Sequence, residues 1–231
     1  MTTLYLIRHA HHLHDRVDGQ GPLLDVGLSA HGRAQAQALR SRLGRSKALR
    51  EGVLISSPQR RATETAAIVA QGLGRPFAAD VEFEEWRNED GTIGGEEFAA
   101  LWLGLPEQQR PFYRFAPGCE SRIEFTTRVH TALNRILLQN EGKTIVLITH
   151  GGVIEASFQF FFGYGDASFH RAYPAFGNAS ITHWRQDENT KCWVLESSND
   201  VQHVREEVAR YSNAASIRHP AAFPLVPRAA A

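Results

Sequence analysis

Short apolar runs alternate along the chain with longer segments in which apolar residues recur at helical spacing. The apolar runs, each typical of a buried strand, are residues 4–7, 53–55 and 144–149. The segments with helical character are residues 30–43, 60–73, 121–140 and 151–162. Strands that alternate with helices predict an α/β fold, a three-layer α/β/α arrangement around a doubly wound, mostly parallel sheet.

The segments between these elements are less regular. Residues 181–184 and 193–196 predict a late hairpin. Residues 91–118 carry Gly, Pro and many aromatic residues, and we interpret them as a helical insertion. Residues 11–29 are polar and rich in glycine, which predicts a loop, and Ser29 at its end is placed to cap the following helix.

Length and composition fit one domain with a substantial core. The chain has 231 residues, of which 42% are hydrophobic. We expect a single domain over residues 1–212. Residues 213–231, with their Pro and Ala content, predict a poorly ordered C-terminal extension.

Charge and cysteine content exclude several classes of protein. Lys plus Arg and Asp plus Glu both number 25, and this balance argues against a nucleic-acid-coating protein. The apolar runs fall short of the roughly 20 residues of a membrane span, and the first residues lack the pattern of a signal peptide. Two cysteines, Cys119 and Cys192, favour a reducing, cytoplasmic setting. The sequence is compatible with a homodimer and specifies no oligomeric state.

Polar residues follow three of the predicted strands at the point where each strand ends. They are the pairs 8–9 (Arg-His), 56–57 (Ser-Ser) and 149–150 (Thr-His). Ligands of doubly wound sheets bind beyond the carboxyl ends of the strands, so we expect one site that contains both histidines. Arg60 and Arg61 begin the helix after the second strand, where guanidinium groups and a helix N-terminus both favour anions. The pattern predicts a site for a tetrahedral anion.

Several segments, in order, match one known family. Residues 6–10, Leu-Ile-Arg-His-Ala, resemble the Leu-hydrophobic-Arg-His-Gly signature of the histidine phosphatase superfamily, the phosphoglycerate-mutase-like clan. The other motifs of this family are similar to residues 25–36, 57–66, 146–154, 176–182 and 199–204. The match spans roughly residues 3–204, and it implies a phosphoglycerate-mutase-like fold and an enzyme.

The resemblance assigns roles to particular residues. His9 is the implied nucleophile, which would form a phosphohistidine intermediate. Arg8, Arg61 and a charged His150 would hold the three non-bridging oxygens, so that fixed cations replace a metal ion and no cofactor is needed. Glu85, within the acidic segment 83–86, is the implied proton donor. Its neighbours Glu82 and Glu84 are alternatives for that role.

The chain departs from the family pattern near the nucleophile. Ala10 replaces the usual Gly and Gln59 replaces a common Leu. Asp15 stands where an Asn often helps to bind phosphate, and an ionised carboxylate there would repel the substrate. We keep Asp15 and Gly151 as candidate substrate-contacting residues.

A histidine cluster lies directly after the nucleophile. It consists of His11, His12 and His14. The cluster admits a metal site as an alternative, since histidine is a common transition-metal ligand. The other interpretation is a polar loop at the entrance for substrate.

We predict a metal-independent phosphatase that acts on a small-molecule phosphate monoester. The mutase-type Arg-His-Gly-x-Ser-x-Trp-Asn run is absent, which disfavours a phosphoglycerate mutase. Mutase-type phosphoryl transfer and a catalytically weak phospholigand-binding protein are the two alternatives. Sugar phosphates, phosphoglycerates, nucleotide-derived monoesters and phosphoproteins all remain open as substrates.

Overall fold

The structure is a computed structural model that describes residues 1–16, 23–87, 95–163 and 174–205. The predicted extension, residues 213–231, lies outside the described residues. The domain boundary at residue 212 therefore stays a prediction.

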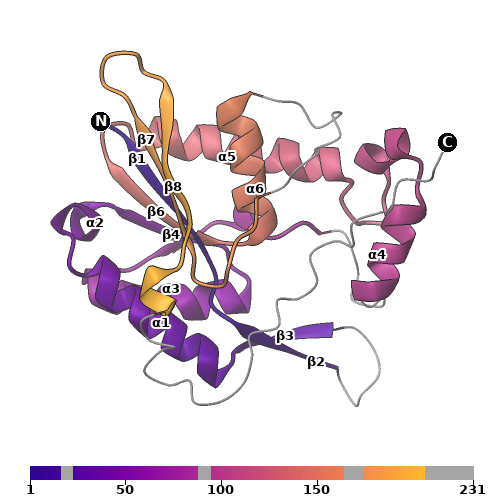
Figure 1. Cartoon of the computed structure of the whole chain (residues 1–231), viewed down its shortest axis with the longest axis horizontal. Coiled ribbons are helices and arrows are strands. Elements are labelled where there is room, and N and C mark those ends of the chain that lie inside the picture. Colours follow the sequence, from indigo (N-terminus) through magenta and orange to yellow (C-terminus); the bar gives the residue numbers. More distant parts are fainter. Residues whose placement is uncertain (17–22, 88–94, 164–173, 206–231) are drawn as a thin grey trace.

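Six strands form the central sheet (Figure 1). In spatial order they are β5 (Ala78–Ala79), β4 (Val53–Ser56), β6 (Thr144–Thr149), β1 (Thr3–Arg8), β7 (Ile181–Gln186) and β8 (Trp193–Asp200). The first four are parallel to one another, whereas β7 and β8 run antiparallel as a hairpin on one edge. The predicted mostly parallel sheet and the late hairpin are confirmed.

Helices cover both faces of this sheet (Figure 1). The α-helices are α1 (Ala30–Leu43), α2 (Lys47–Glu51), α3 (Arg60–Leu73), α4 (Gly95–Gly104), α5 (Arg122–Gln139) and α6 (Gly151–Phe162). Two 3₁₀ helices, η2 (Val81–Phe83) and η3 (Glu107–Phe112), are also present. Ser29 caps α1 as predicted, because its Oγ accepts a hydrogen bond from the Gly32 N–H at 2.9 Å.

Alternate residues of the buried strands face two separate cores. On β1, Tyr5 and Ile7 pack against the core beneath α1 and α3. Leu4 and Leu6 belong instead to the core beneath α5 and α6. Strands buried on both faces read as continuous apolar runs, and this explains why the sequence revealed β1 and β6 so clearly.

The expected loop over residues 11–29 is partly wrong. Its ends form an antiparallel hairpin of β2 (His12–Arg16) and β3 (Leu23–Leu28), which lies outside the main sheet (Figure 1). The Glu64 carboxylate of α3 accepts a hydrogen bond from the Leu28 N–H at 2.9 Å. Gly27 adopts a φ of +93°, which glycine tolerates best. This contact with α3 and this backbone conformation cannot be predicted from the local sequence of a polar segment.

The predicted helical insertion is confirmed by α4 and η3. Its aromatic residues pack on the domain through Trp86, whose ring lies 5.4 Å from that of Trp102 and 6.4 Å from that of Phe115 between centroids. The short elements α2, β5 and η2 were not predicted, because each is too brief to show a hydrophobic period. In the described part of the chain, no helix is long and apolar enough to cross a membrane.

Candidate active site

The polar residues that follow β1, β4 and β6 meet at one edge of the sheet. The His9 N–H donates to the Thr149 carbonyl at 2.8 Å, and the Ser57 N–H donates to the Ile148 carbonyl at 2.9 Å. The imidazole rings of His9 and His150 lie 5.2 Å apart between centroids. Both side chains are buried. Parallel strands that end at the same edge therefore bring the two histidines together.

The hydrogen bonds of His9 define its tautomer. Its Nδ1 lies 2.9 Å from the Ala10 carbonyl oxygen, which can only accept, so Nδ1 carries the hydrogen. Nε2 then holds the lone pair and accepts from the Nε–H of Arg61 at 3.2 Å. Burial, followed by the charges of Arg61 and Arg8, holds the pKa of His9 well below its usual value. A neutral imidazole with an available lone pair at Nε2 is the form that can attack phosphorus.

Arg61, at the start of α3, is oriented by the side chains of two other residues, Asp25 and Gln59. Asp25 Oδ2 accepts from its backbone N–H at 3.0 Å and from Nη1 at 2.9 Å. The Gln59 side-chain carbonyl accepts from Nη2 at 2.8 Å. Burial raises the pKa of Asp25, but the hydrogen bonds and charge of Arg61 outweigh burial and leave that pKa lowered. Asp25 is therefore an ionised partner that directs the guanidinium toward His9.

His150 sits fully buried at the N-cap of α6. Its Nε2 lies 2.8 Å from the Ser57 hydroxyl. Burial first, and then the charges of Arg61 and His9, lower its pKa well below the usual value. The expectation of a charged His150 concerns the site with phosphate bound and stays a prediction, whereas in the protein alone these cations disfavour the imidazolium. A phosphate dianion placed among them would act in the opposite direction.

Two buried nitrogens at this edge lack a hydrogen-bond partner among the described residues. They are Arg8 Nε and His150 Nδ1. Arg8 donates through Nη1 to the Phe176 carbonyl, which fixes one arm of its guanidinium. Burial lowers the pKa of Arg8, while the nearby carboxylate of Glu85 opposes that effect. Buried polar groups are normally paired, so the two nitrogens point to a ligand that supplies oxygen acceptors.

The Glu85 side chain contacts the first turn of α6, the helix that begins directly after His150. Its Oε2 accepts from the Gly152 N–H at 3.1 Å, and its Oε1 accepts from the Trp86 N–H at 3.0 Å. A β-carbon on residue 152 would lie 2.3 Å from Oε1, so only glycine leaves room for this carboxylate. The structure thus places Glu85 at the first turn after His150, where its charge acts on Arg8.

A buried ion pair supports the backbone that carries Glu85. The Arg128 guanidinium donates to the carbonyl oxygens of Glu82 at 2.6 Å and Glu84 at 3.2 Å. It also forms a two-pronged pair with the Glu120 carboxylate at 2.6 and 2.7 Å. Such a fork is rigid, because both planar groups are fixed by two parallel bonds.

The histidines of the cluster after the nucleophile make different contacts. The His12 ring meets the His9 ring edge-on, with centroids 4.7 Å apart, whereas the His11 Nδ1 bonds to the Ser29 hydroxyl at 2.8 Å. The side chains of His14 and Asp15, on β2, lie outside the described residues. No group of three or more His, Cys, Asp or Glu residues is arranged to hold a metal ion among those the structure describes. Gly151 adjoins Arg8, whose Nε lies 3.8 Å from the site of a β-carbon on residue 151.

Comparison with known proteins shows to which superfamily the chain belongs. The profile of the histidine phosphatase superfamily (branch 1) matches residues 4–201. The chain belongs to the histidine phosphatase superfamily. It is 30% identical to phosphoglycerate mutase-like protein 4 of Arabidopsis thaliana over 79% of this chain and 78% of that one. It is 26% identical to the metal-independent phosphoserine phosphatase of the same plant over 88% and 84%.

A solved structure gives the same picture for this histidine phosphatase. The mycobacterial glucosyl-3-phosphoglycerate phosphatase superposes with a TM-score of 0.66 at 25% identity, over 85% of this chain and 98% of that one. The α/β fold with a mostly parallel sheet is that of the phosphoglycerate-mutase-like histidine phosphatases. Family membership identifies the chain as a phosphatase-type hydrolase.

Some residues that contact the site of this histidine phosphatase were given no role from the sequence. Ser57, Asp25 and Gln59 fall inside or beside matched segments, so a role for each could have been suspected from position alone. Arg128 and Gly152 gave no comparable signal of their contacts with the Glu85 segment. Those contacts join α5, α6 and the loop after η2, and local sequence does not specify such packing.

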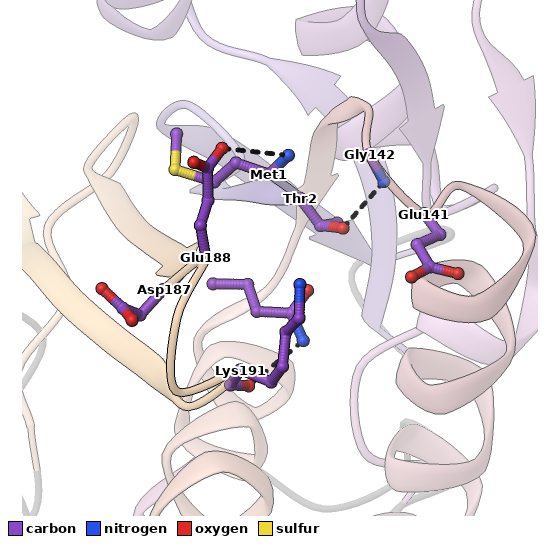
Figure 2. A pocket seen from close by; sticks show the side chains of 8 residues that line it. Met1, Thr2, Glu141, Gly142, Asp187, Glu188 and Lys191 are labelled. Carbon is purple, nitrogen blue, oxygen red and sulfur yellow. Dashed lines mark hydrogen bonds and ion pairs between the residues drawn. The ribbon is translucent and has the colours of Figure 1, made fainter.

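A separate cavity lies at the opposite end of β1 (Figure 2). It has a volume of about 300 Å³, and Met1, Thr2, Glu141 and Lys191 are among the residues that line it. The amino group of Met1 lies 3.7 Å from the Glu188 carboxylate, and the Thr2 hydroxyl accepts from the Gly142 N–H at 2.9 Å. Because β1 separates this cavity from His9, it is not part of the histidine site.

Proposed function

We propose that this histidine phosphatase hydrolyses small phosphate monoesters through a phosphohistidine at His9 and without a metal ion. The observation that carries the proposal is the neutral His9, whose Nε2 lone pair faces the Arg61 Nε–H at 3.2 Å inside a cationic site. Arg8 and His150 each add a buried nitrogen without a partner among the described residues. These groups match the three non-bridging oxygens of a phosphoryl group.

The proposed reaction has two balanced steps. First, Nε2 of His9 forms a bond to phosphorus as the ester P–O bond breaks, and Glu85 gives its proton to the leaving oxygen. Then the Glu85 carboxylate takes a proton from water as the water oxygen bonds to phosphorus and the P–Nε2 bond breaks. Inorganic phosphate leaves, and both side chains return to their starting states. Arg8, Arg61 and His150 stabilise the charge on the phosphoryl oxygens in both steps.

Relatives suggest which monoesters to test. Their names include phosphoserine phosphatase and glucosyl-3-phosphoglycerate phosphatase, so we propose a phosphorylated metabolite of low molecular mass. One relative is named phosphoglycerate mutase-like, which keeps phosphoryl transfer between hydroxyl groups as a second candidate. We also propose a reducing, cytoplasmic setting, which the free thiols of Cys119 and Cys192 support. A homodimer is compatible with the proposal, and sedimentation of the purified chain tests it.

Phosphate release from a panel of monoesters tests the proposed function. The panel contains phosphoserine, 3-phosphoglycerate, glucosyl-3-phosphoglycerate and p-nitrophenyl phosphate, each with and without EDTA. We expect chelator-resistant release that His9→Ala abolishes and that vanadate inhibits. Conversion of 3-phosphoglycerate to its 2-isomer without phosphate release would favour the mutase. Binding without either reaction would favour a phospholigand-binding protein.

A further inference from the structure

We propose that His12 is a third imidazole of the active site, which contacts the phosphoryl group on the side of the nucleophile and stabilises it while it is bonded to His9. This inference rests on the proposed function. It concerns a residue for which neither the resemblance nor the matched family suggested a role. The histidine at this position was singled out from the sequence only as part of a cluster.

The first support is the contact between the two rings. The centroids of His9 and His12 lie 4.7 Å apart and the planes meet at 88°. His9 is only 3% exposed, whereas His12 is half-buried and reaches the surface. His12 therefore lines the site beside the nucleophile.

The second support is that a strand holds His12 in place. His12 is the first residue of β2 and pairs with Leu28 of β3. The Glu64 carboxylate binds the Leu28 N–H at 2.9 Å, which ties the hairpin to α3. A side chain on an anchored strand is held more precisely than one on a loop, as a catalytic contact requires.

Charge gives the third support. A proton on His12 would act on both His9 and His150, because its charge lowers the pKa of each. His12 therefore faces the same space as Arg8 of β1, Arg61 of α3 and His150 at the start of α6. The two carboxylates near that space have other partners: Asp25 binds Arg61, and Glu85 binds the first turn of α6.

The direction of the reaction then limits what His12 can do. In an in-line displacement the leaving oxygen lies opposite the attacking Nε2, and charge spreads over the three equatorial oxygens. A ring in edge contact with His9 lies on the nucleophile's side and can reach an equatorial oxygen. Each such oxygen accepts more than one hydrogen bond, so a fourth donor has a place beside Arg8, Arg61 and His150. The leaving oxygen remains with Glu85.

The rates of the two chemical steps distinguish a role of His12 from that of the proton donor. The equatorial oxygens are present both when the phosphoryl group moves onto His9 and when water removes it. Loss of a donor to these oxygens slows both steps, and it does so equally for good and poor leaving groups. Loss of the proton donor slows the first step most for poor leaving groups.

Rapid-quench kinetics of His12→Phe and His12→Gln test the inference. Phe keeps an aromatic ring against His9 without a polar atom, and Gln restores an amide donor. We expect His12→Phe to slow both formation and decay of the phosphoenzyme by about tenfold, with equal factors for p-nitrophenyl phosphate and an alkyl phosphate. We expect His12→Gln to recover part of each rate. His11→Gln is the matched control and should keep the wild-type rates, because its ring bonds to Ser29.

Two results would overturn the inference. One is wild-type rates in His12→Phe, and the other is a loss confined to the alkyl phosphate, which would assign His12 to the leaving group. Circular dichroism of each variant separates a kinetic effect from a failure to fold. If the wild-type enzyme itself turns over with no phosphoenzyme, the proposed function fails, and the inference fails with it.

Discussion

The Glu85 carboxylate is bound to the backbone of the helix that begins directly after His150. Its Oε2 accepts the Gly152 N–H at 3.1 Å, at the positive end of α6. The same helix therefore holds both the imidazole that we propose for the phosphoryl oxygens and the carboxyl group that we propose for the leaving oxygen. This coupling explains how two residues 65 positions apart in the chain keep a constant relative position.

Replacement of Glu85 by Gln should separate leaving groups. Gln keeps the shape of the side chain but supplies no acidic proton. We expect kcat to fall by about a hundredfold or more with an alkyl phosphate and much less with p-nitrophenyl phosphate, whose leaving group needs little protonation. Glu84→Gln is the control, because its carboxylate pairs with Arg87 at 2.8 Å. Equal losses for both substrates would reject Glu85 as the proton donor.

Replacement of Gly152 by Ala should reproduce that pattern without unfolding the protein. The new methyl group would lie 2.3 Å from Oε1 of Glu85 and 3.2 Å from the Phe125 ring. A flexible carboxylate moves at low cost, and Ala favours a helix by up to about 1 kcal/mol over Gly, so we expect little change in the free energy of unfolding.

The kinetic effect of Gly152→Ala is then the sensitive measurement. We expect a larger loss of kcat with alkyl phosphates than with p-nitrophenyl phosphate, since the displaced carboxyl group no longer meets the leaving oxygen. Gly104→Ala is the control, because nothing lies within 4 Å of its added carbon. Unchanged kinetics in Gly152→Ala would show that the carboxylate position seen here is not the working one.

Removal of the Asp25 carboxylate should misalign Arg61. We expect Asp25→Ala to lower kcat/KM for p-nitrophenyl phosphate by about tenfold or more, since the Arg61 guanidinium and N–H lose a shared acceptor. Asp25→Asn keeps an oxygen acceptor and should recover part of the loss. A higher kcat/KM in Asp25→Ala would instead mean that the pair holds Arg61 back from phosphate.

An ion pair between α1 and the end of β8 should make stability depend on pH. The hydrogen bonds of Arg42 lower the pKa of Asp200 from 3.8 to about 2. Because the folded pKa is below the unfolded one, the stabilisation is present above about pH 4 and disappears as the pH falls toward 2. The side chains are 34% and 25% exposed, so we expect a contribution of about 1 kcal/mol or less.

Urea unfolding of Asp200→Asn across pH 2–7 measures this contribution. The variant should be less stable than the wild type at pH 6, and the difference should shrink to nothing near pH 2. Glu51→Gln is the control, since its carboxylate is 68% exposed and lies 3.7 Å from Lys47. A difference that grows as the pH falls would contradict the assignment.

The sequence predicted the elements whose own residues carry the signal. The apolar runs of β1 and β6 and the long helices α1, α3, α5 and α6 follow from local patterns of burial. We could predict that Arg8, His9 and His150 lie close together, because each lies at the end of a strand or just beyond it. Arg61 came from its place at a helix start as well as from the family resemblance, whereas Glu85 came from the resemblance alone.

Other features depend on contacts between distant segments. The β2 strand is mostly polar, and a two-stranded hairpin is marginal by itself, so contacts such as that of Leu28 with Glu64 of α3 support it. The contact of His12 with His9 arises only once that hairpin has formed. The lowered pKa of His150 likewise depends on full burial next to Arg61, which no local pattern of residues specifies.

Identification of the phosphorylated atom tests the central claim most directly. The enzyme is mixed with substrate, quenched in base, and analysed by mass spectrometry and ³¹P NMR to locate the phosphoryl group. Because Nδ1 of His9 is engaged by the Ala10 carbonyl, the account predicts phosphate on Nε2 of His9 and none in His9→Ala. Phosphate on Nδ1, on another residue, or undiminished turnover in His9→Ala would contradict it.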